Sequence, residues 1–446
     1  MFWRILYRAY RITTWLRHFA VRRFTRTGLF LVGGLMMMAM VGADTENTVA
    51  YQGFALLLAL LLLSIFSRLS FRLRFVAARN LPRFGTVGQP FRYRVSIQNL
   101  SSQTQRGLTL LDDLADPRPA FPEWREHHKY EAKHSHSIRI QARRRLNPFR
   151  VATTREAELA VVPPGQSVDV GIELKPLRRG VLRFTGVTLA RPDPLNLFRA
   201  FSRVFVPQSA LILPHRYTLP PIELPGSMKY QEGGVAMASQ VGQSDEFVAL
   251  REYRRGDPLR HIHWRSWAKA GKPIVKEFQD EFFVRHALVL DTFTDQEHGE
   301  LFEEAVSVAA SFAATVRTQE SLLDLLFVGA KAFTFTAGRG LAHADQMLEI
   351  LASVRPCGDK AISTLEHLLV GHIGVVSGCV FVLLGWDQVR QDLVKKTRRM
   401  GVPVLVLVIA VPGQAKWLLP GPMQDEPHRF HVLELGRVEE GLSKLS

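Results

Sequence analysis

Two apolar runs stand near the start of the chain. The first covers residues 28–43, and the second covers residues 49–66 and carries no charged side chain. A helix of about 20 apolar residues spans a bilayer, and the first run approaches that length by extending back over Phe24 while Arg26 reaches for the interface. The five residues 44–48 between the two runs, of which Asp44 and Glu46 are acidic, are too few to cross the bilayer again. The pattern predicts a transmembrane helical hairpin over residues 28–67.

From residue 75 to residue 214 the apolar pattern changes to a period of two. Residues 91–98 and 168–175 alternate between apolar and polar or small side chains, as half-buried antiparallel strands do. Turn residues bracket them, with glycine and proline at 88–90 and 163–165. The pattern predicts an immunoglobulin-like β-sandwich domain over residues 75–214. Within it, residues 116–158 are polar and irregular, and we expect them to form an exposed insertion.

The last part of the chain, residues 282–446, alternates between predicted strands and helices. Short apolar strands are expected at 286–290 and 322–328, with an edge strand at 333–336. Residues 380–384 and 402–411 are wholly apolar, as expected of strands buried on both faces. Helical spacing of apolar residues begins at Phe302 and again near Met347. These elements predict a doubly wound α/β sheet, preceded by a proline- and glycine-rich linker at 215–242.

Charge places these segments relative to a membrane. The formal net charge is +16, and all seven arginines between Arg4 and Arg26 precede the first apolar run without an acidic residue among them. Residues 1–27 therefore resemble a basic amphipathic segment with aromatic rings at headgroup depth, and an anionic membrane explains the charge better than nucleic acid does. Arginines flank both outer ends of the apolar runs, so we expect both termini in the cytoplasm. The two cysteines, Cys357 and Cys379, lack metal-type spacing.

The stretch from 243 to 281 combines eight basic residues with five aromatic residues. Arginine and tryptophan are enriched at partner surfaces, because guanidinium groups bind carboxylates and stack on rings. The stretch is either such a surface or a salt-bridged connection between two domains, and the two roles are compatible. The residues expected to carry it are Arg251, Tyr253, Gly256, Asp257, Arg260, Trp264 and Lys276.

The same stretch resembles the signature of a bacterial family, the domain of unknown function 58. The resemblance is carried by EF at 246–247, LREY at 250–253, GDPLR at 256–260 with Ile262 and Trp264, and VKEF at 275–278. It implies a membrane hairpin and a β-rich domain before the signature and a von Willebrand A-like domain after it. It also implies two partners, a MoxR-type AAA+ ATPase and a transglutaminase-like membrane protein, and it supplies no catalytic residue.

Candidate chemistry is sparse. A von Willebrand A metal site has the pattern Asp-x-Ser-x-Ser after its first strand. Here Asp291 fits the first position, but Phe293 and Asp295 replace the two serines, and Asp387 could supply a late carboxylate. We expect this degenerate site to bind no metal. No phosphate-binding glycine loop occurs, so no nucleotide or other cofactor is expected.

These patterns predict a membrane-anchored α+β multidomain protein, and the resemblance implies that the membrane is the bacterial inner membrane. We expect it to act as an adaptor or scaffold without catalytic activity. Two alternatives remain open, a metal-dependent ligand-binding von Willebrand A module and an enzyme with its site near Asp257 or Asp291.

Overall fold

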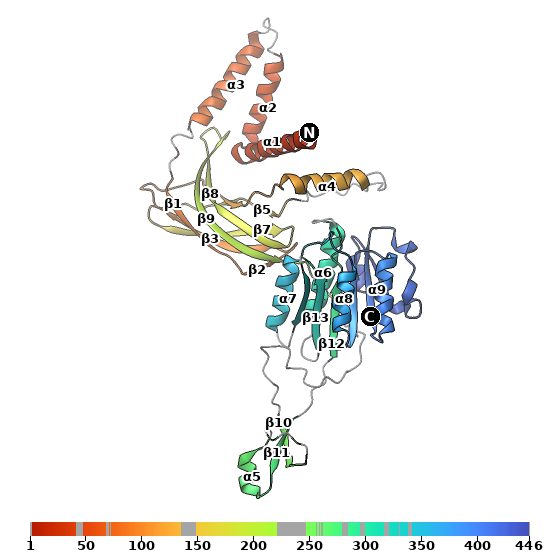
Figure 1. Cartoon of the computed structure of the whole chain (residues 1–446). Coiled ribbons are helices and arrows are strands. Elements are labelled where there is room, and N and C mark those ends of the chain that lie inside the picture. The colour runs from red at the N-terminus through yellow and green to blue at the C-terminus, as the bar shows by residue number, and fades with distance from the viewer. Residues whose placement is uncertain are drawn as a thin grey trace. The chain divides into compact units, whose positions relative to one another are not determined.

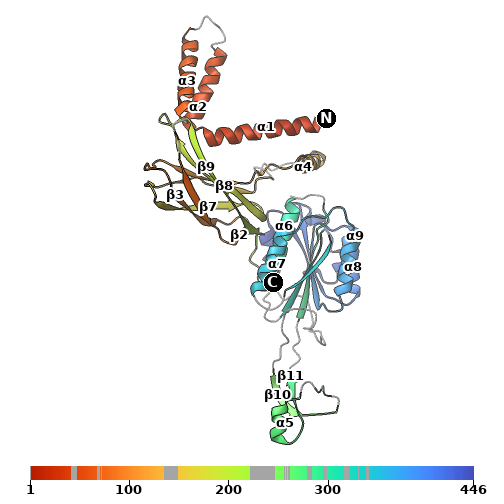
Figure 2. The ribbon, with the colours of Figure 1, turned by 60° about the vertical axis from the view of Figure 1, so that its left-hand side comes forward.

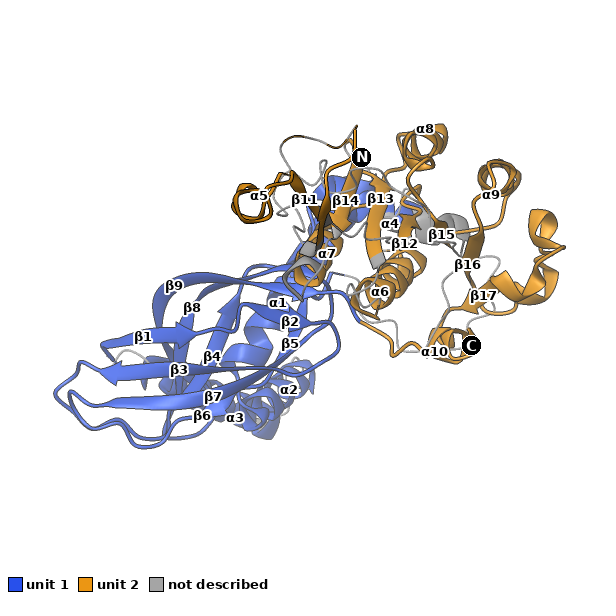
Figure 3. Cartoon of the chain, turned by 90° about the horizontal axis from the view of Figure 1, so that it is seen from below, with its two compact units in different colours: residues 1–215 blue, residues 216–446 orange. Residues whose placement is uncertain are grey.

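The structure is a computed structural model, and its described residues fall into two compact units. They are residues 2–41, 48–67, 71, 73–134, 149–220, 247–255, 257, 259, 262–278, 284–294, 299–315, 321–329, 331–337 and 341–445. Unit 1 covers residues 1–215 and unit 2 covers residues 216–446 (Figure 3). Strands and helices occur in both units, so the chain is of the mixed α+β type.

Two sheets make up most of unit 1. One has the strand order β1-β3-β7-β5 and the other β2-β9-β8-β4-β6. The strands are β1 (Phe75–Asn80), β2 (Phe84–Thr86), β3 (Phe91–Asn99), β4 (Thr109–Leu114), β5 (Ala152–Thr154), β6 (Ala157–Glu158), β7 (Ser167–Pro176), β8 (Gly180–Pro192) and β9 (Arg199–Leu213). Strands β3 and β7 are the alternating segments of the sequence, and they pair antiparallel from Phe91 opposite Leu174 to Gln98 opposite Ser167.

One apolar core joins the two sheets of unit 1. The inward residues of β3, from Phe91 to Ile97, are almost fully buried with Leu182, Phe184 and Ile212 of the other sheet. Tyr93 meets Phe184 edge-on at 5.6 Å between ring centroids. The strict alternation along β3 and β7 therefore corresponds to one face packed in the core and one face exposed, because successive side chains of a strand point to opposite faces.

The predicted exposed insertion is wrong for part of its length. Residues 121–134 form helix α4 (Phe121–His134), and its Trp124 is only 1% exposed. Helix α1 (Phe2–Arg23) lies against α4: Trp124 contacts the rings of Trp3, Tyr7 and Tyr10. These three N-terminal rings pack on the protein rather than at headgroup depth. Helix α4 has no long apolar stripe, and its aromatic contacts with α1 are made by Trp124 and Phe121.

Two apolar helices follow α1. Helix α2 covers Arg26–Val41 and helix α3 covers Thr48–Ser67, and the two lie side by side (Figures 1 and 2). Among the described residues, one helix is long and apolar enough to cross a membrane, Val49–Ser67 in α3, whereas α2 is shorter. Of the two predicted spans, only the second therefore meets the length of a span.

Unit 2 contains a sheet in the order β14-β13-β12-β15-β16-β17, parallel except for β14 at one edge. Figure 3 shows α6, α7 and α10 on one face and α8 and α9 on the other. The strands are β12 (Val284–Leu290), β13 (Ser321–Val328), β14 (Ala332–Ala337), β15 (Gly378–Leu383), β16 (Val404–Ala410) and β17 (Phe430–Glu434). The helices are α6 (Glu300–Thr315), α7 (Leu341–Ser353), α8 (Ser363–His372), α9 (Gln388–Arg399) and α10 (Val438–Leu442).

The strand order of this sheet reverses at one point. The chain passes from β12 to β13 on one side and then to β15 on the other side of β12, so the order reverses between β12 and β15. Ligands of open α/β sheets bind beyond the carboxyl ends of the strands at such a switch point. Every residue of β15 and β16 is buried, which explains their wholly apolar sequences.

The signature stretch forms a small module of its own elements. Strands β10 (Phe247–Glu252) and β11 (Ile274–Phe278) pair antiparallel, and helix α5 (Trp264–Ala270) lies in the connection between them. Gly271 ends α5 in the left-handed region, at φ 64°, with its N–H donated to the carbonyl of Trp267. Glycine adopts that conformation without the cost that a side chain imposes.

Candidate functional site

The module formed by β10, α5 and β11 carries a tight ionic turn. Both Asp257 carboxylate oxygens accept hydrogen bonds from the Arg251 guanidinium, at 2.7 and 2.8 Å, and Oδ2 also accepts the Arg254 backbone N–H at 2.7 Å. The bonds from Arg251 and then from Arg254 lower the pKa of Asp257 to about 2. At neutral pH Asp257 is a carboxylate held by donors, which suits a structural role better than proton transfer.

The outer surface of the module is apolar and basic. Trp264 is 67% exposed and stacks on Trp267 at 5.2 Å between ring centroids, and Leu259 is 68% exposed. Between Arg251 and Lys276 the chain has eight lysines and arginines and two acidic residues. Both acids are paired, Asp257 with Arg251 and Glu252 with Lys272. The exposed basic side chains on the described residues are Arg254, Arg255, Arg265, Lys269, Lys272 and Lys276.

The predicted residues of this surface have different surroundings. The backbone N–H of Tyr253 donates to the carbonyl of Pro273, and the Tyr253 side chain is half-buried. Lys276 is exposed on β11 opposite Leu250. Gly256 and Arg260 lie outside the described residues. The structure therefore brings Arg251 and Asp257 into contact and leaves Trp264 accessible, while the role of the stretch stays a prediction.

A second candidate lies at the switch point of the large sheet. Asp291, at the carboxyl end of β12, is fully buried and accepts the backbone N–H groups of Phe293 and Leu384, both at 2.9 Å. Its Oδ2 also accepts the Arg390 Nε–H at 2.6 Å. Arg390 in turn donates from Nη1 to Asp387 Oδ2 at 2.5 Å. Asp387 also caps α9 by accepting the Arg390 backbone N–H.

A guanidinium thus lies beside two of the three carboxylates that the sequence offered to a metal. Although burial opposes the charge of Arg390, Asp291 and Asp387 raise its pKa above the ordinary value, so the cation stays protonated. Among the described residues no group of three or more His, Cys, Asp or Glu is arranged to hold a metal ion. The third candidate ligand, Asp295, lies outside those residues. Nothing in the sequence pattern links Arg390 to Asp291, because 99 positions separate them.

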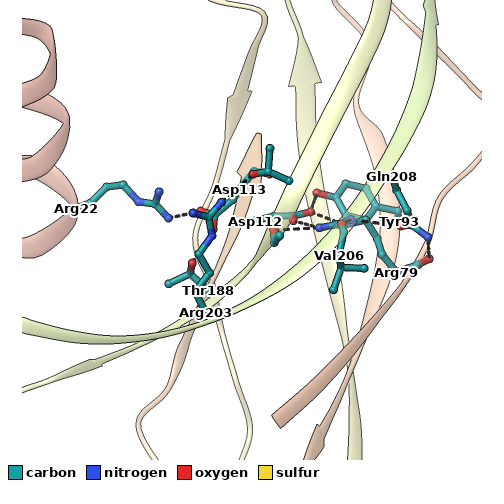
Figure 4. A network of polar contacts seen from close by, with 11 residues as sticks. Arg22, Arg79, Tyr93, Asp112, Asp113, Thr188, Arg203, Val206 and Gln208 are labelled. Carbon is teal, nitrogen blue, oxygen red and sulfur yellow. Dashed lines mark hydrogen bonds and ion pairs between the residues drawn. The ribbon is translucent and has the colours of Figure 1, made fainter. Parts of the chain in front are cut away.

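A third polar cluster lies in unit 1 and was not predicted. Arg79 and Asp112 are almost completely buried and form an ion pair, with Arg79 Nη2 2.5 Å from Asp112 Oδ1. Tyr93 donates its hydroxyl to Asp112 Oδ2, and burial raises the pKa of Tyr93 so that it keeps this proton. Figure 4 shows the neighbouring Asp113 turned the other way, toward Arg22.

The two adjacent acids of β4 therefore bind different parts of unit 1. Asp112 of β4 links the two sheets through its ion pair with Arg79 of β1. Arg79 also donates to the carbonyls of Val206 and Gly186. Asp113 accepts Arg22 of α1 at 2.5 Å, Arg203 at 3.0 Å and the Thr188 hydroxyl at 2.6 Å. Helix α1 is thus tied to the β-sheets by an ion pair.

Among the described residues these features define a mixed α+β protein with several sheets, one helix long and apolar enough to cross a membrane, and a basic-aromatic module. Residues 249–424 match the family described as "Protein of unknown function DUF58", so the match begins within β10 and ends beyond β16. The chain is also similar to the uncharacterized protein YeaD of Bacillus subtilis (strain 168). The two are 25% identical over 281 residues, which cover 61% of this chain and 68% of YeaD.

Solved structures show only distant likeness. A crystal structure of Salmonella alpha-2-macroglobulin reacted with methylamine aligns with 36% of this chain at 10% identity and a TM-score of 0.18. The chain spans only 9% of that protein. The CARDB domain of PF1109 from Pyrococcus furiosus aligns over 93% of its own length and 31% of this chain, at 9% identity and a TM-score of 0.15.

Proposed function

We propose that this chain is an adaptor of the bacterial inner membrane, without catalytic activity of its own, which recruits a partner through the module of β10, α5 and β11. The observation that most supports this proposal is the exposure of Trp264 among six exposed basic side chains. Tryptophan and arginine dominate the binding energy of protein interfaces. Because both acids of that stretch are already paired, the surface offers cationic groups to an acidic partner.

The partner proposed first is a MoxR-type AAA+ ATPase, which the family resemblance implies. A transglutaminase-like membrane protein is the second. In this account the chain takes part in the assembly or maturation of envelope or metal-dependent complexes, and it holds the ATPase at the membrane while the ATPase supplies the energy.

The anchor is proposed to be a hairpin of α2 and α3. At 1.5 Å per residue the 16 residues of α2 reach about 24 Å, short of the bilayer core of about 30 Å, and local thinning would accommodate the difference. Gly34 and Gly53 lie at the contact of the two helices: a Cβ at Gly34 would lie 3.6 Å from the Leu57 side chain, and one at Gly53 would lie 3.6 Å from the Met38 side chain, both ordinary van der Waals distances. Both chain ends are then cytoplasmic.

The large sheet is proposed to be a von Willebrand A-like domain whose metal site has been replaced by an internal ion pair. The strand order and the buried Asp291 after β12 support this reading. The alternative of a metal-dependent module requires a divalent cation beside Asp291, where the Arg390 guanidinium lies. The alternative of an enzyme at Asp257 or Asp291 requires a carboxyl group able to exchange protons, and arginine binds both carboxylates.

Affinity capture tests the proposal. The detergent-solubilised chain and a variant lacking residues 243–281 are used as bait in extracts of the same bacterium. We expect the complete chain to retain an AAA+ ATPase and the shortened chain to lose it. Equal retention by both would refute the assignment of the partner surface, provided that the shortened chain unfolds at the same temperature as the complete one.

A further inference from the structure

Helix α1 has two faces with different surroundings. At 3.6 residues per turn, Trp3, Tyr7, Tyr10 and Thr14 lie along one side of the helix, and all are half-buried. The Tyr7 hydroxyl donates to the carbonyl of Pro119 at 2.8 Å, and its ring lies 5.4 Å from that of Trp124. This side is the protein-facing side of α1.

The opposite side is apolar and uncovered. Ile5, Ile12, Leu16 and Phe19 recur at spacings of seven, four and three, which places them on one line about half a turn away from Tyr7. They are 60%, 58%, 51% and 39% exposed. Four exposed apolar side chains on one line of an otherwise basic helix indicate a surface that is covered in the working protein.

The charges on the helix show what covers the stripe. Arg4, Arg8 and Arg11 lie along one edge of it, together with Trp15, and residues 1–43 contain no acidic side chain. Arginine binds phosphate oxygens, and a helix with an apolar face bordered by arginine and tryptophan lies in the interface of an anionic bilayer. A second copy of α1 would instead bring like charges together.

The end of α1 is fixed to the β-sheets. The Thr25 hydroxyl donates to the Asn196 carbonyl, and Phe24 pairs with Phe198. At Gly28 a Cβ would lie only 2.0 Å from the Leu197 carbonyl oxygen, so only glycine permits this approach. Helix α1 therefore turns into α2 at a defined elbow, and Figures 1 and 2 show it running across the direction of α2 and α3.

We infer that α1 lies flat on the anionic headgroups of the membrane that α2 and α3 enter, with Ile5, Ile12, Leu16 and Phe19 directed toward the acyl chains. This inference rests on the membrane anchor of the proposed function. The apolar stripe of α1 enters the boundary between headgroups and acyl chains to a depth of about 5–10 Å. The protein-facing side keeps its hold on α4, and Arg22 keeps its bond to Asp113, so the helix fixes the β-sheets of unit 1 against the bilayer.

Spin labels on the full chain test the orientation. The chain is reconstituted into vesicles of phosphatidylcholine with or without phosphatidylglycerol, and Ile12→Cys and Thr14→Cys are labelled in turn. Both native cysteines are buried, and the unsubstituted chain reports their background labelling. In anionic vesicles we expect the label at 12 to collide with oxygen far more than with a water-soluble nickel chelate. The label at 14 should collide little with either.

The dependence of docking on the arginines of α1 supplies the control. Arg4→Gln, Arg8→Gln and Arg11→Gln together should lower the ratio of docked to undocked α1 on the order of a hundredfold, at about fivefold per arginine. Nickel access at position 12 in anionic vesicles would overturn the inference, as would spin–spin broadening that places a second copy there. A chain that fails to float with the vesicles would overturn the anchor itself, so the two failures are distinguishable.

Discussion

The ion pair between Asp291 and Arg390 gives the most quantitative prediction. The Asp291 side chain is fully buried, and that of Arg390 is 13% exposed. Arg390→Ala removes the cation, while the N–H groups of Phe293 and Leu384 still bind the carboxylate. Loss of one partner from a buried pair costs about 3–5 kcal/mol. Because two donors remain, we expect a cost near the lower end, about 3 kcal/mol.

Thermal unfolding of the fragment 216–446, which is one compact unit, measures this cost. For a domain of this size a loss of about 3 kcal/mol lowers Tm by about 6–12 °C. Lys396→Ala is the matched control, because Lys396 lies on the same helix and forms an exposed pair with Glu366 that is worth about 0–1 kcal/mol. If Arg390→Ala lowers Tm no more than Lys396→Ala, the pair does not stabilise the switch point and the reasoning fails.

The membrane topology, the metal site and the ionic turn can each be tested directly. Reporter fusions at Asn47 and at the C-terminus should lie on opposite sides of the membrane, and a periplasmic C-terminus would exclude a cytosolic ATPase as partner. Millimolar Mg²⁺ or Ca²⁺ should leave the Tm of fragment 216–446 unchanged, whereas a rise of several degrees that is abolished by Asp291→Ala would restore the metal-dependent module. The pKa of Asp257 should be about 2 by NMR titration and rise toward about 3.9 in Arg251→Gln. Because the pKa of Asp257 is depressed in the folded state, the stabilisation from Asp257 is present above about pH 4 and is lost as the pH falls toward 2. A pKa of Asp257 that stays unchanged in Arg251→Gln would show that Arg251 is not the cause.

The strands that could be predicted are those whose own sequence pattern shows which of their faces are buried. Alternation marked β3 and β7, because each has one buried and one exposed face. Continuous apolar runs marked β15 and β16, which are buried on both faces. Strand β17 was missed, since its Phe430, His431 and Val432 are only half-buried and its sequence has neither pattern.

Contacts between distant segments were not predictable. Helix α4 looked like an exposed insertion because Trp124 finds its aromatic partners in α1, more than a hundred positions earlier. The same limit applies to the candidate sites. Asp291 was recognised by its place after a strand, but its cation Arg390 lies on a different helix, and only the fold brings them together. In the signature stretch Asp257 and Arg251 are only six residues apart, and a salt-bridged stretch was one of the two roles predicted there.

The module of β10, α5 and β11 is proposed to bind a partner through Trp264 and its basic neighbours. The most direct test measures the partner affinity and the Tm of the same preparations of Trp264→Ala, with Arg260→Ala as a second variant. Trp417→Ala is the matched control, because Trp417 is 83% exposed and lies outside the module. We predict that Trp264→Ala weakens partner capture by about 2 kcal/mol or more at an unchanged Tm, while Trp417→Ala leaves the affinity unaltered. A lower Tm with unchanged affinity of the folded protein would contradict the account and make the stretch a connection between domains.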